Sequence, residues 1–260
     1  MNLIVSTAPF FLRPVHEAFR CISDAGFTGV EVMVTHDENT QDAGKLARAA
    51  SEFGLMVEAI HAPSLLLTRH VWGTDPIGKA ARAVEMASDV GAKVVVAHPP
   101  YRWQHGYRAW LEQEMPSLSE RAGVTVAMEN MFPMRARKLK GPRLHDHDLG
   151  GYANTTLDTS HAAVAGHDPI EAAAEAGERL SHVHLSNNSG KGWDSHLPVY
   201  EGVLPIAGLL RQLAESGYGG GVSLELDLRR WMDDPAALRD VLARNRESCT
   251  AAVGANLVSC

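Results

Sequence analysis

The sequence predicts a single α/β domain folded as a closed (β/α)₈ barrel, the TIM-barrel architecture. Short apolar runs that resemble buried strands alternate with helix-like runs along the whole chain, a pattern typical of a parallel sheet. Eight such units fill about 250 residues, which is the size of one barrel. A doubly wound open sheet is the alternative. It is disfavoured because no G-x-G-x-x-G motif follows the first strand.

Eight apolar runs are predicted to be the parallel strands, and their starts lie roughly 25 to 40 residues apart. The run V-V-V-A in the fourth is the clearest signal, because a strand covered on both faces is apolar without alternation. The predicted strands are Leu3–Thr7, Gly29–Val34, Met56–His61, Lys93–His98, Thr125–Glu129, Asn154–Asp158, His182–Leu185 and Gly221–Leu226.

The segments between these strands carry helix signals, and most end at a glycine. Pro116 is expected to kink or split its helix. The run D-P-I-E at 168–171 is a strong helix start, with a cap, a first-turn proline and a capping-box glutamate. No clear helix appears from residue 132 to 152, so the fifth helix is short or missing. The predicted helices are Pro14–Ala25, Asp42–Phe53, Ile77–Val90, Trp110–Ala122, 168–177, Pro205–Ser216 and 234–245.

The composition is that of one globular domain, which we expect to span residues 1–250, with a loose tail at 251–260. A formal net charge of −7 argues against broad nucleic-acid binding. The three scattered cysteines favour a reducing, cytoplasmic setting. No run approaches the roughly 18 apolar residues of a membrane span, and the first residues lack the features of a signal peptide. The sequence leaves a homo-oligomer open.

Ionisable side chains stand at or near the ends of six predicted strands. Because barrel active sites lie at the carboxyl ends of the strands, we expect these side chains to meet. One such histidine alone is usually just a polar surface residue. Carboxylates among apolar neighbours, however, need a cation, and the only Lys or Arg in the predicted strands lies at the wrong end of its strand. The whole set therefore predicts a metal site formed by His61, His98, Glu129, Asp158, His184 and Glu225.

Two further ionisable residues lie within the predicted strands. Glu31 lies inside the second strand, between two valines, and we assign it no role. His182 lies two residues before His184, so it also faces inward, but nearer the opposite end of the barrel. We interpret His182 as a structural histidine.

Several motifs resemble those of the xylose-isomerase-like superfamily over nearly the whole chain. They are G-V-E-V at the second strand, E-N at the fifth, L-D-T-S-H at the sixth, H-V-H-L-S-N with D-S-H at the seventh, and G-Y-G-G-G-V-S-L-E-L at the eighth. This superfamily holds sugar isomerases, sugar 3-epimerases, sugar-phosphate isomerase/epimerase-like proteins and endonuclease IV. The isomerase and epimerase resemblance implies one divalent ion (Mn, Mg, Co or Zn) held by Glu129, Asp158, His184 and Glu225.

The resemblance to endonuclease IV implies up to three zinc ions instead. Its nine ligand positions all carry suitable residue types in this sequence, although many epimerase-like members share that pattern. We favour one ion over three. The five additional ligand candidates, for further metal ions or for substrate, are His61, His98, His161, Asp194 and His196.

The predicted function is therefore a metal-dependent isomerase or epimerase of a sugar, a sugar phosphate or a related hydroxy-ketone. Glu129 and Glu225 are the predicted catalytic bases, which transfer a proton through a metal-stabilised enediolate. Trp103, Arg135 and Trp193 are predicted to bind the substrate. One departure concerns the loop after His196. Many members carry G-x-G there, whereas a tyrosine replaces the first glycine here.

Three alternative functions stay open. An endonuclease IV-like zinc phosphodiesterase would cleave DNA at abasic sites, and a basic stretch after the fifth strand could hold its phosphates. A barrel that binds a metal or small molecule without turnover is the second, and dehydration or lyase chemistry on a keto-sugar acid is the third. The acidic composition and the single basic stretch favour sugar chemistry over the nuclease. That stretch contains Arg135, Arg137, Lys138, Lys140 and Arg143.

Overall fold

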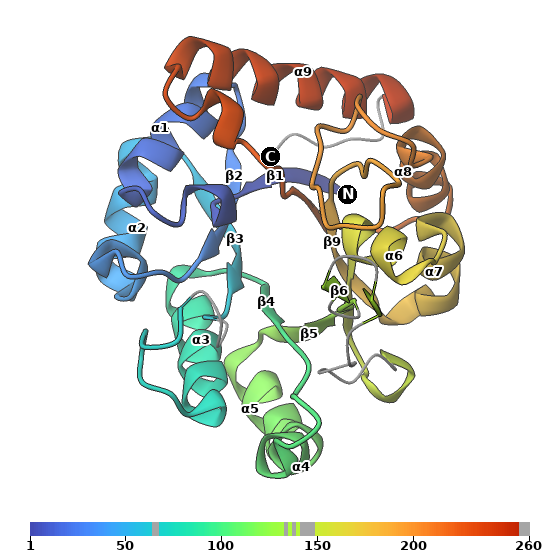
Figure 1. Ribbon diagram of the computed structural model, residues 1–260. Coiled ribbons are helices and arrows are strands. Elements are labelled where there is room, and N and C mark those ends of the chain that lie inside the picture. Colours follow the sequence, from blue (N-terminus) through green and yellow to red (C-terminus); the bar gives the residue numbers. More distant parts are fainter. Residues whose placement is uncertain (64–67, 133–134, 137–138, 141–148, 255–260) are drawn as a thin grey trace.

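The eight predicted strands close into a parallel barrel in the computed structural model, which describes residues 1–63, 68–132, 135–136, 139–140 and 149–254. The strand order around the barrel is β1-β10-β9-β8-β5-β4-β3-β2, and β1 pairs with both β2 and β10. Figure 1 looks along the barrel axis and shows the helices arranged around the strands. The predicted (β/α)₈ architecture is confirmed, and the open-sheet alternative is wrong because the sheet has no free edge.

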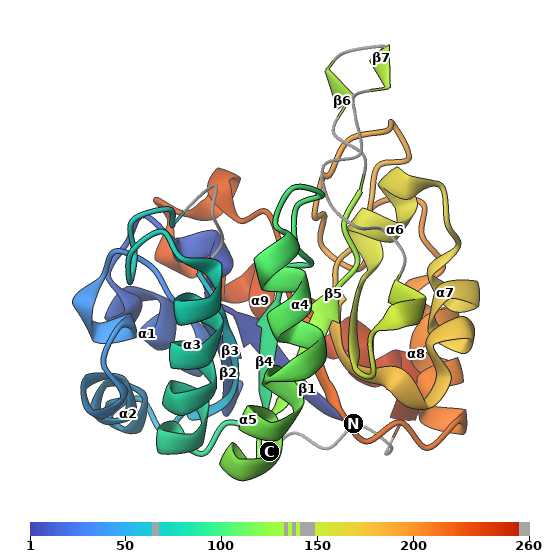
Figure 2. The same ribbon diagram turned by 90° about the horizontal axis from the view of Figure 1, so that it is seen from below.

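The strands match their predicted positions to within a few residues. A short antiparallel hairpin, formed by β6 and β7, follows β5 and projects from the barrel at the end opposite the N-terminus (Figure 2). The strands are β1 (Asn2–Ser6), β2 (Gly29–Met33), β3 (Met56–His61), β4 (Val94–Ala97), β5 (Thr125–Glu129), β6 (Arg135–Ala136), β7 (Leu139–Lys140), β8 (Thr155–Asp158), β9 (Leu180–Leu185) and β10 (Gly221–Leu224).

Several helices begin at an aspartate cap, and Asp168 is the cap that the sequence predicts. The side chains of Asp42, Asp75, Asp168 and Asp234 each accept hydrogen bonds from backbone N–H groups of the first turn that otherwise lack a partner. The helices are α1 (Val15–Asp24), α2 (Ala43–Glu52), α3 (Pro76–Val90), α4 (His105–Gln113), α5 (Met115–Ala122), α6 (Thr159–Ala165), α7 (Pro169–Ala176), α8 (Ile206–Glu215) and α9 (Pro235–Val253), with 3₁₀ turns at Ala8–Phe10, Glu38–Thr40, Leu149–Gly151, Gly177–Arg179 and Arg229–Trp231.

Three helix predictions can be compared with the structure. Pro116 lies in the first turn of α5, so the predicted helix is split into α4 and α5 as expected. Between β5 and β8 the described residues contain the hairpin and a 3₁₀ turn, which agrees with a missing fifth helix. The predicted end of the last helix near Asn245 is wrong. Helix α9 continues to Val253, because no helix-breaking residue precedes Gly254 and because Cys249 and Val253 are buried. Residues 251–253 therefore belong to the helix, while 255–260 lie outside the described part of the chain.

Successive residues of each strand point alternately outward, toward the helices, and inward, into the barrel. Outward positions, rich in Val, Ile and Leu, pack against the helices and form the main core. A smaller cluster of Ala59, Val94, Val96 and Ala127 belongs to β3, β4 and β5 and is separate from that core. Gly221 is needed on the inner side, because a Cβ there would lie 3.0 Å from the ring of His182. The ionisable side chains lie instead at the carboxyl-terminal ends of the strands.

None of the helices in the described ranges combines the length and apolar character that crossing a membrane would require.

Candidate metal centre

Four side chains from four neighbouring strands converge at the carboxyl-terminal end of the barrel. Glu129 and Asp158 are the last residues of β5 and β8, His184 lies near the end of β9, and Glu225 directly follows β10. Glu129, Asp158 and His184 are at most 1% exposed, while the Glu225 side chain is 16% exposed toward the mouth. These are the four residues that the resemblance to isomerases and epimerases implies as metal ligands.

The distances within this four-residue site suit a small divalent cation. His184 Nδ1 lies 2.8 Å from Glu225 Oε2, 3.2 Å from Glu129 Oε1 and 3.8 Å from Asp158 Oδ2. One donor atom from each of the four residues lies within 4.8 Å of all the others. A tetrahedral zinc ion with ligands at about 2.0–2.2 Å would need donor atoms roughly 3.3–3.6 Å apart. The arrangement can therefore close around one ion with small side-chain adjustments.

The carboxylate oxygens support the same conclusion. Glu129 Oε2, Asp158 Oδ2 and Glu225 Oε2 are buried and accept no hydrogen bond of good geometry within the described residues. Two of them are approached only as ion pairs, Glu129 Oε2 by His98 at 3.1 Å and Glu225 Oε2 by His184 at 2.8 Å. Burying three carboxylates together is costly unless cations or hydrogen-bond donors compensate them. Oxygen and imidazole donors are the ligands that Mn²⁺, Mg²⁺, Co²⁺ and Zn²⁺ accept. These residues therefore fit a divalent metal ion.

Two further donor sets adjoin the first. In one, His98 Nε2 lies 3.2 Å from His61 Nε2 and 3.1 Å from Glu129 Oε2. In the other, Asp194 Oδ2 lies 2.9 Å from His196 Nε2 and 3.3 Å from His161 Nε2. All five additional candidates are thus brought beside the four-residue site, and Glu129 contacts donors of all three sets. The residues present could hold more than one ion.

The charges of the site are strongly coupled. Burial opposes ionisation of Glu129, yet His184, His161 and His98 together hold the pKa of its carboxyl well below its usual range. Burial likewise opposes protonation of His184, but Glu31, Glu225 and Glu129 raise its pKa well above the ordinary value. In the metal-free protein His184, whose pKa is raised, thus serves as a cationic partner of these carboxylates.

Asp158 behaves differently, because its burial outweighs its favourable partners. Burial raises the pKa of its carboxyl to about 6, against the opposing effects of His161 and His196. The same side chain caps helix α6, where Oδ1 accepts a hydrogen bond of 2.7 Å from the backbone N–H of His161. Its Oδ2 is left to face the four-residue site.

We expect Asp158→Asn to stabilise the metal-free protein at pH 8 by about 1–3 kcal/mol, because one pKa unit corresponds to about 1.4 kcal/mol. A carboxyl with a raised folded-state pKa contributes stability while protonated, and that contribution is lost as the pH rises through about 6. The advantage of asparagine should therefore shrink as the pH falls from 8 to 5. Thermal unfolding of both metal-free proteins across this range measures it. A variant less stable than wild type at pH 8, or a gain independent of pH, would contradict the expectation.

The predicted substrate residues lie in the segments that follow barrel strands β4, β5 and β9. Trp103 follows β4, is 62% exposed and stacks on Tyr101, with ring centroids 4.9 Å apart. Trp193 follows β9 and is 56% exposed, with the Lys191 ammonium 5.9 Å from its ring. Arg135 begins β6, but its side chain lies outside the described part of the structure, as do residues 137, 138 and 143 of the basic stretch. The substrate roles of these residues stay predictions.

The altered loop after His196 has its own supporting contacts. The Arg244 guanidinium lies 3.9 Å from the ring centroid of Tyr200, the residue at the first glycine position. Gly202 has φ +103°, and a Cβ there would lie 2.5 Å from the carbonyl oxygen of Asn188. The second glycine is therefore required by close backbone approach, while the tyrosine is accommodated by packing on arginine.

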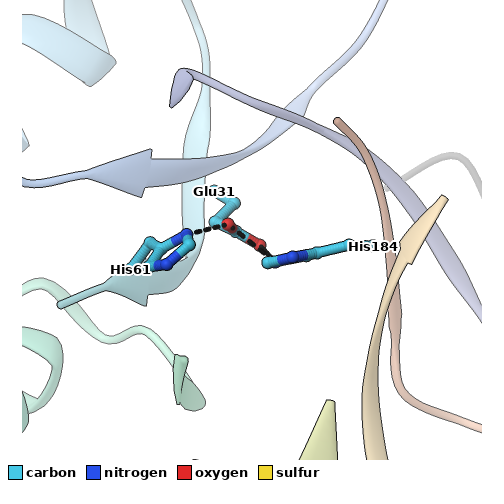
Figure 3. Close-up of side chains that lie close together, drawn as sticks. All are labelled: Glu31, His61 and His184. Atoms are coloured by element: carbon cyan, nitrogen blue, oxygen red, sulfur yellow. Dashed lines mark hydrogen bonds and ion pairs between the residues drawn. The ribbon is translucent and has the colours of Figure 1, made fainter. Parts of the chain in front are cut away.

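Glu31 is the residue at this site to which the sequence analysis assigned no role. It is fully buried on β2 and contacts three histidines, His61, His182 and His184 (Figure 3 shows two of them). Its place between Val30 and Val32 in an apolar strand was the available signal, because a carboxylate there needs a partner. His182, expected to be structural, is 1% exposed, and its Nε2 lies 2.6 Å from Glu31 Oε2.

Comparison with known proteins identifies relatives over most of the chain. The family model described as the xylose isomerase-like TIM barrel matches residues 19–247. An uncharacterised protein of Mycobacterium tuberculosis is 35% identical over 244 residues, which is 85% of this chain and 87% of that protein.

Solved structures with a similar fold include sugar epimerases. A D-tagatose 3-epimerase-like protein superposes with a TM-score of 0.71 at 20% identity, over 96% of this chain and 99% of that one. The 3-keto-D-glucoside 4-epimerase of E. coli superposes with a TM-score of 0.68 at 21% identity, over 95% and 99% of the two chains. At these identities the likeness concerns the fold.

Proposed function

We propose that this chain, which belongs to the xylose isomerase-like TIM barrel family, is a divalent-metal-dependent isomerase or epimerase of a sugar, a sugar phosphate or a related hydroxy-ketone. Its fold is that of sugar epimerases and isomerases. The observation that carries the proposal is the convergence of Glu129, Asp158, His184 and Glu225 from four strands. Three buried carboxylate oxygens of this site accept no hydrogen bond of good geometry among the described residues.

The chemistry of such a substrate matches what these residues can do. A divalent ion held by the four side chains would stabilise the negative charge that develops on a substrate oxygen when a neighbouring C–H bond loses its proton. Glu129 and Glu225 both present a carboxylate oxygen at this point of the barrel whose contacts among the described residues are histidine ion pairs rather than hydrogen bonds of good geometry. One carboxylate removes the proton from the carbon beside the carbonyl, and the other returns a proton.

The direction of proton return distinguishes the two reaction types. Delivery to the same carbon from the opposite face gives an epimer, whereas delivery to the former carbonyl carbon gives an isomer. Strands β8 and β9 lie between β5 and β10, so Glu129 and Glu225 come from strands that are not neighbours, and both reach His184 Nδ1. Glu225, with a side chain 16% exposed, is the more accessible of the two from the barrel mouth.

A zinc phosphodiesterase is the second candidate, and a specific observation favours it. All nine ligand positions of the endonuclease IV pattern lie in the three adjoining donor sets around Glu129. The net charge of −7 disfavours an extended DNA-binding face and keeps sugar chemistry as the first choice.

Solvent exchange tests the proposal without knowledge of the natural substrate. The metal-loaded protein is incubated in D₂O with a panel of ketopentoses, ketohexoses and their phosphates, and C–H signals are followed by NMR. Deuterium is expected at the carbon beside the carbonyl of at least one substrate, together with its epimer or isomer. Cleavage of abasic-site DNA without sugar exchange would support the phosphodiesterase. Binding without exchange or cleavage would support a non-catalytic barrel, and loss of water or carbon–carbon cleavage of a keto-sugar acid would point to lyase chemistry.

A further inference from the structure

Glu31 faces the His184 ring from the side opposite to the carboxylates of the four-residue site. Both of its oxygens are engaged. Oε2 lies 2.6 Å from His182 Nε2 and 3.1 Å from His184 Nε2, and Oε1 lies 3.4 Å from His61 Nδ1. Figure 3 shows the carboxylate between the rings of His61 and His184, with an interaction drawn to each. Ser6 Oγ, on the neighbouring strand β1, donates a longer hydrogen bond of 3.4 Å to Oε1.

The two nitrogens of His184 have separate partners. Nδ1 faces Glu225, Glu129 and Asp158, whereas Nε2 faces Glu31. The cationic ring of the metal-free protein must give up one proton to bind a metal, and the neutral imidazole then keeps its other proton on the second nitrogen. With that proton on Nε2 and donated to the Glu31 carboxylate, the lone pair of Nδ1 points at the four-residue site. A ligating histidine commonly has its second nitrogen held by a carboxylate in this way.

The two nitrogens of His61 also have separate partners, but here Nδ1 rather than Nε2 faces Glu31. Its Nδ1 lies on the Glu31 side, while its Nε2 lies 3.2 Å from His98 Nε2 and 3.7 Å from Glu129 Oε2. Glu31 is therefore placed between one histidine of the four-residue site and one histidine of an adjoining donor set. Its own position is held from the far side by His182.

We propose that Glu31 is a positioning residue for the metal centre, whose carboxylate holds His184 by Nε2 and faces His61 Nδ1, so that the other nitrogen of each ring is presented for metal binding. The inference rests on the proposed function, because it assumes that the four-residue site binds a divalent ion. It goes further by assigning a role to a carboxylate outside the four ligands.

Direct ligation by Glu31 is the competing interpretation. Glu31, His61 and His184 do offer donor atoms within 4.8 Å of one another. An ion there would bind Nε2 of His184, and the ring would keep its proton on Nδ1, which faces three carboxylates. His184 could then not bind a metal ion together with those carboxylates. Nδ1 faces three carboxylates, whereas Nε2 faces Glu31, whose Oε2 already lies 2.6 Å from His182 Nε2. This division favours Nδ1 as the ligand and Glu31 as its support.

Cobalt titration tests the inference by binding rather than by activity. Metal-free wild type, Glu31→Gln and Glu31→Asp are titrated with Co²⁺ and followed by calorimetry and by the visible d–d absorption. We expect Glu31→Gln to bind Co²⁺ about 10- to 100-fold more weakly, with the stoichiometry unchanged at saturation. Glu31→Asp, which keeps the charge, should recover part of this loss. Glu58→Gln is the matched control, because Glu58 lies on the neighbouring strand β3 and is absent from the contacts of the metal centre described above.

Each outcome separates the inference from the proposed function. Unchanged Co²⁺ affinity in Glu31→Gln overturns the positioning role, and loss of one bound ion at saturation overturns it in favour of direct ligation. A wild type that binds no Co²⁺ would instead refute the proposed function. Circular dichroism of each metal-free variant shows whether it is folded. If Glu31→Gln is unfolded, Glu31→Asp decides: a loss of affinity smaller than about 10-fold supports the role of the charge, and a loss of about 10- to 100-fold contradicts it.

Discussion

Glu129→Gln and Glu225→Gln are each expected to lower epimerisation or isomerisation by at least about 10³-fold, within the range that a positioned general base contributes. Glutamine keeps the size of the side chain but cannot accept the substrate proton. Because both residues are also predicted metal ligands, turnover is measured at saturating metal with the bound metal quantified. If both variants stay active, the two-carboxylate proton transfer is wrong.

The two variants should also differ in how they exchange deuterium. In an epimerase each carboxylate serves one face of the substrate, so each variant retains one base. We expect each variant to exchange the C–H of one epimer with D₂O without converting it, and the two variants to act on opposite epimers. Exchange of both epimers by one variant would show that the removed carboxylate is not a base.

Removal of the metal is the second large effect. Dialysis against a chelator is expected to abolish activity and to lower the free energy of unfolding by about 3 kcal/mol relative to protein at 100-fold excess of metal over its Kd. The reason is that the ion binds only the folded site and compensates three buried carboxylates. Activity and differential scanning calorimetry before and after readdition of Mn²⁺, Mg²⁺, Co²⁺ or Zn²⁺ measure both effects.

A matched variant controls for side effects of the chelator. Asp158→Asn lacks one ligand, so its unfolding temperature should respond much less to metal than that of the wild type. Equal activity and equal unfolding temperature of wild type with and without chelator would contradict metal dependence.

The strands and their inward-facing donors were predictable because they depend on local patterns. An apolar run of four to six residues followed by a helix signal defines a barrel strand, and the period of two decides which side chains share its inner face. Glu129, Asp158 and His184 follow from these rules alone. In the run L-D-T-S-H these rules predict the strand but not the helix that follows it. Asp158 caps helix α6, which begins directly at the next residue and was not predicted.

The role of Glu31 could not be predicted because its partners are distant in sequence. His182 lies 151 residues away and meets Glu31 only when the barrel closes. The number of bound metal ions likewise cannot be predicted from the residue types alone. Glu129 contacts donors of three sets, so the same nine side chains are compatible with one ion or with several.

Metal content per chain tests the central claim most directly. The protein is purified without added chelator, loaded with a mixture of Mn²⁺, Mg²⁺, Co²⁺ and Zn²⁺, freed of unbound ions, and analysed by inductively coupled plasma mass spectrometry. We predict one divalent ion per chain in the wild type and a large loss of it in Asp158→Asn. Three zinc ions per chain, or no bound metal at all, would contradict a single-metal isomerase or epimerase.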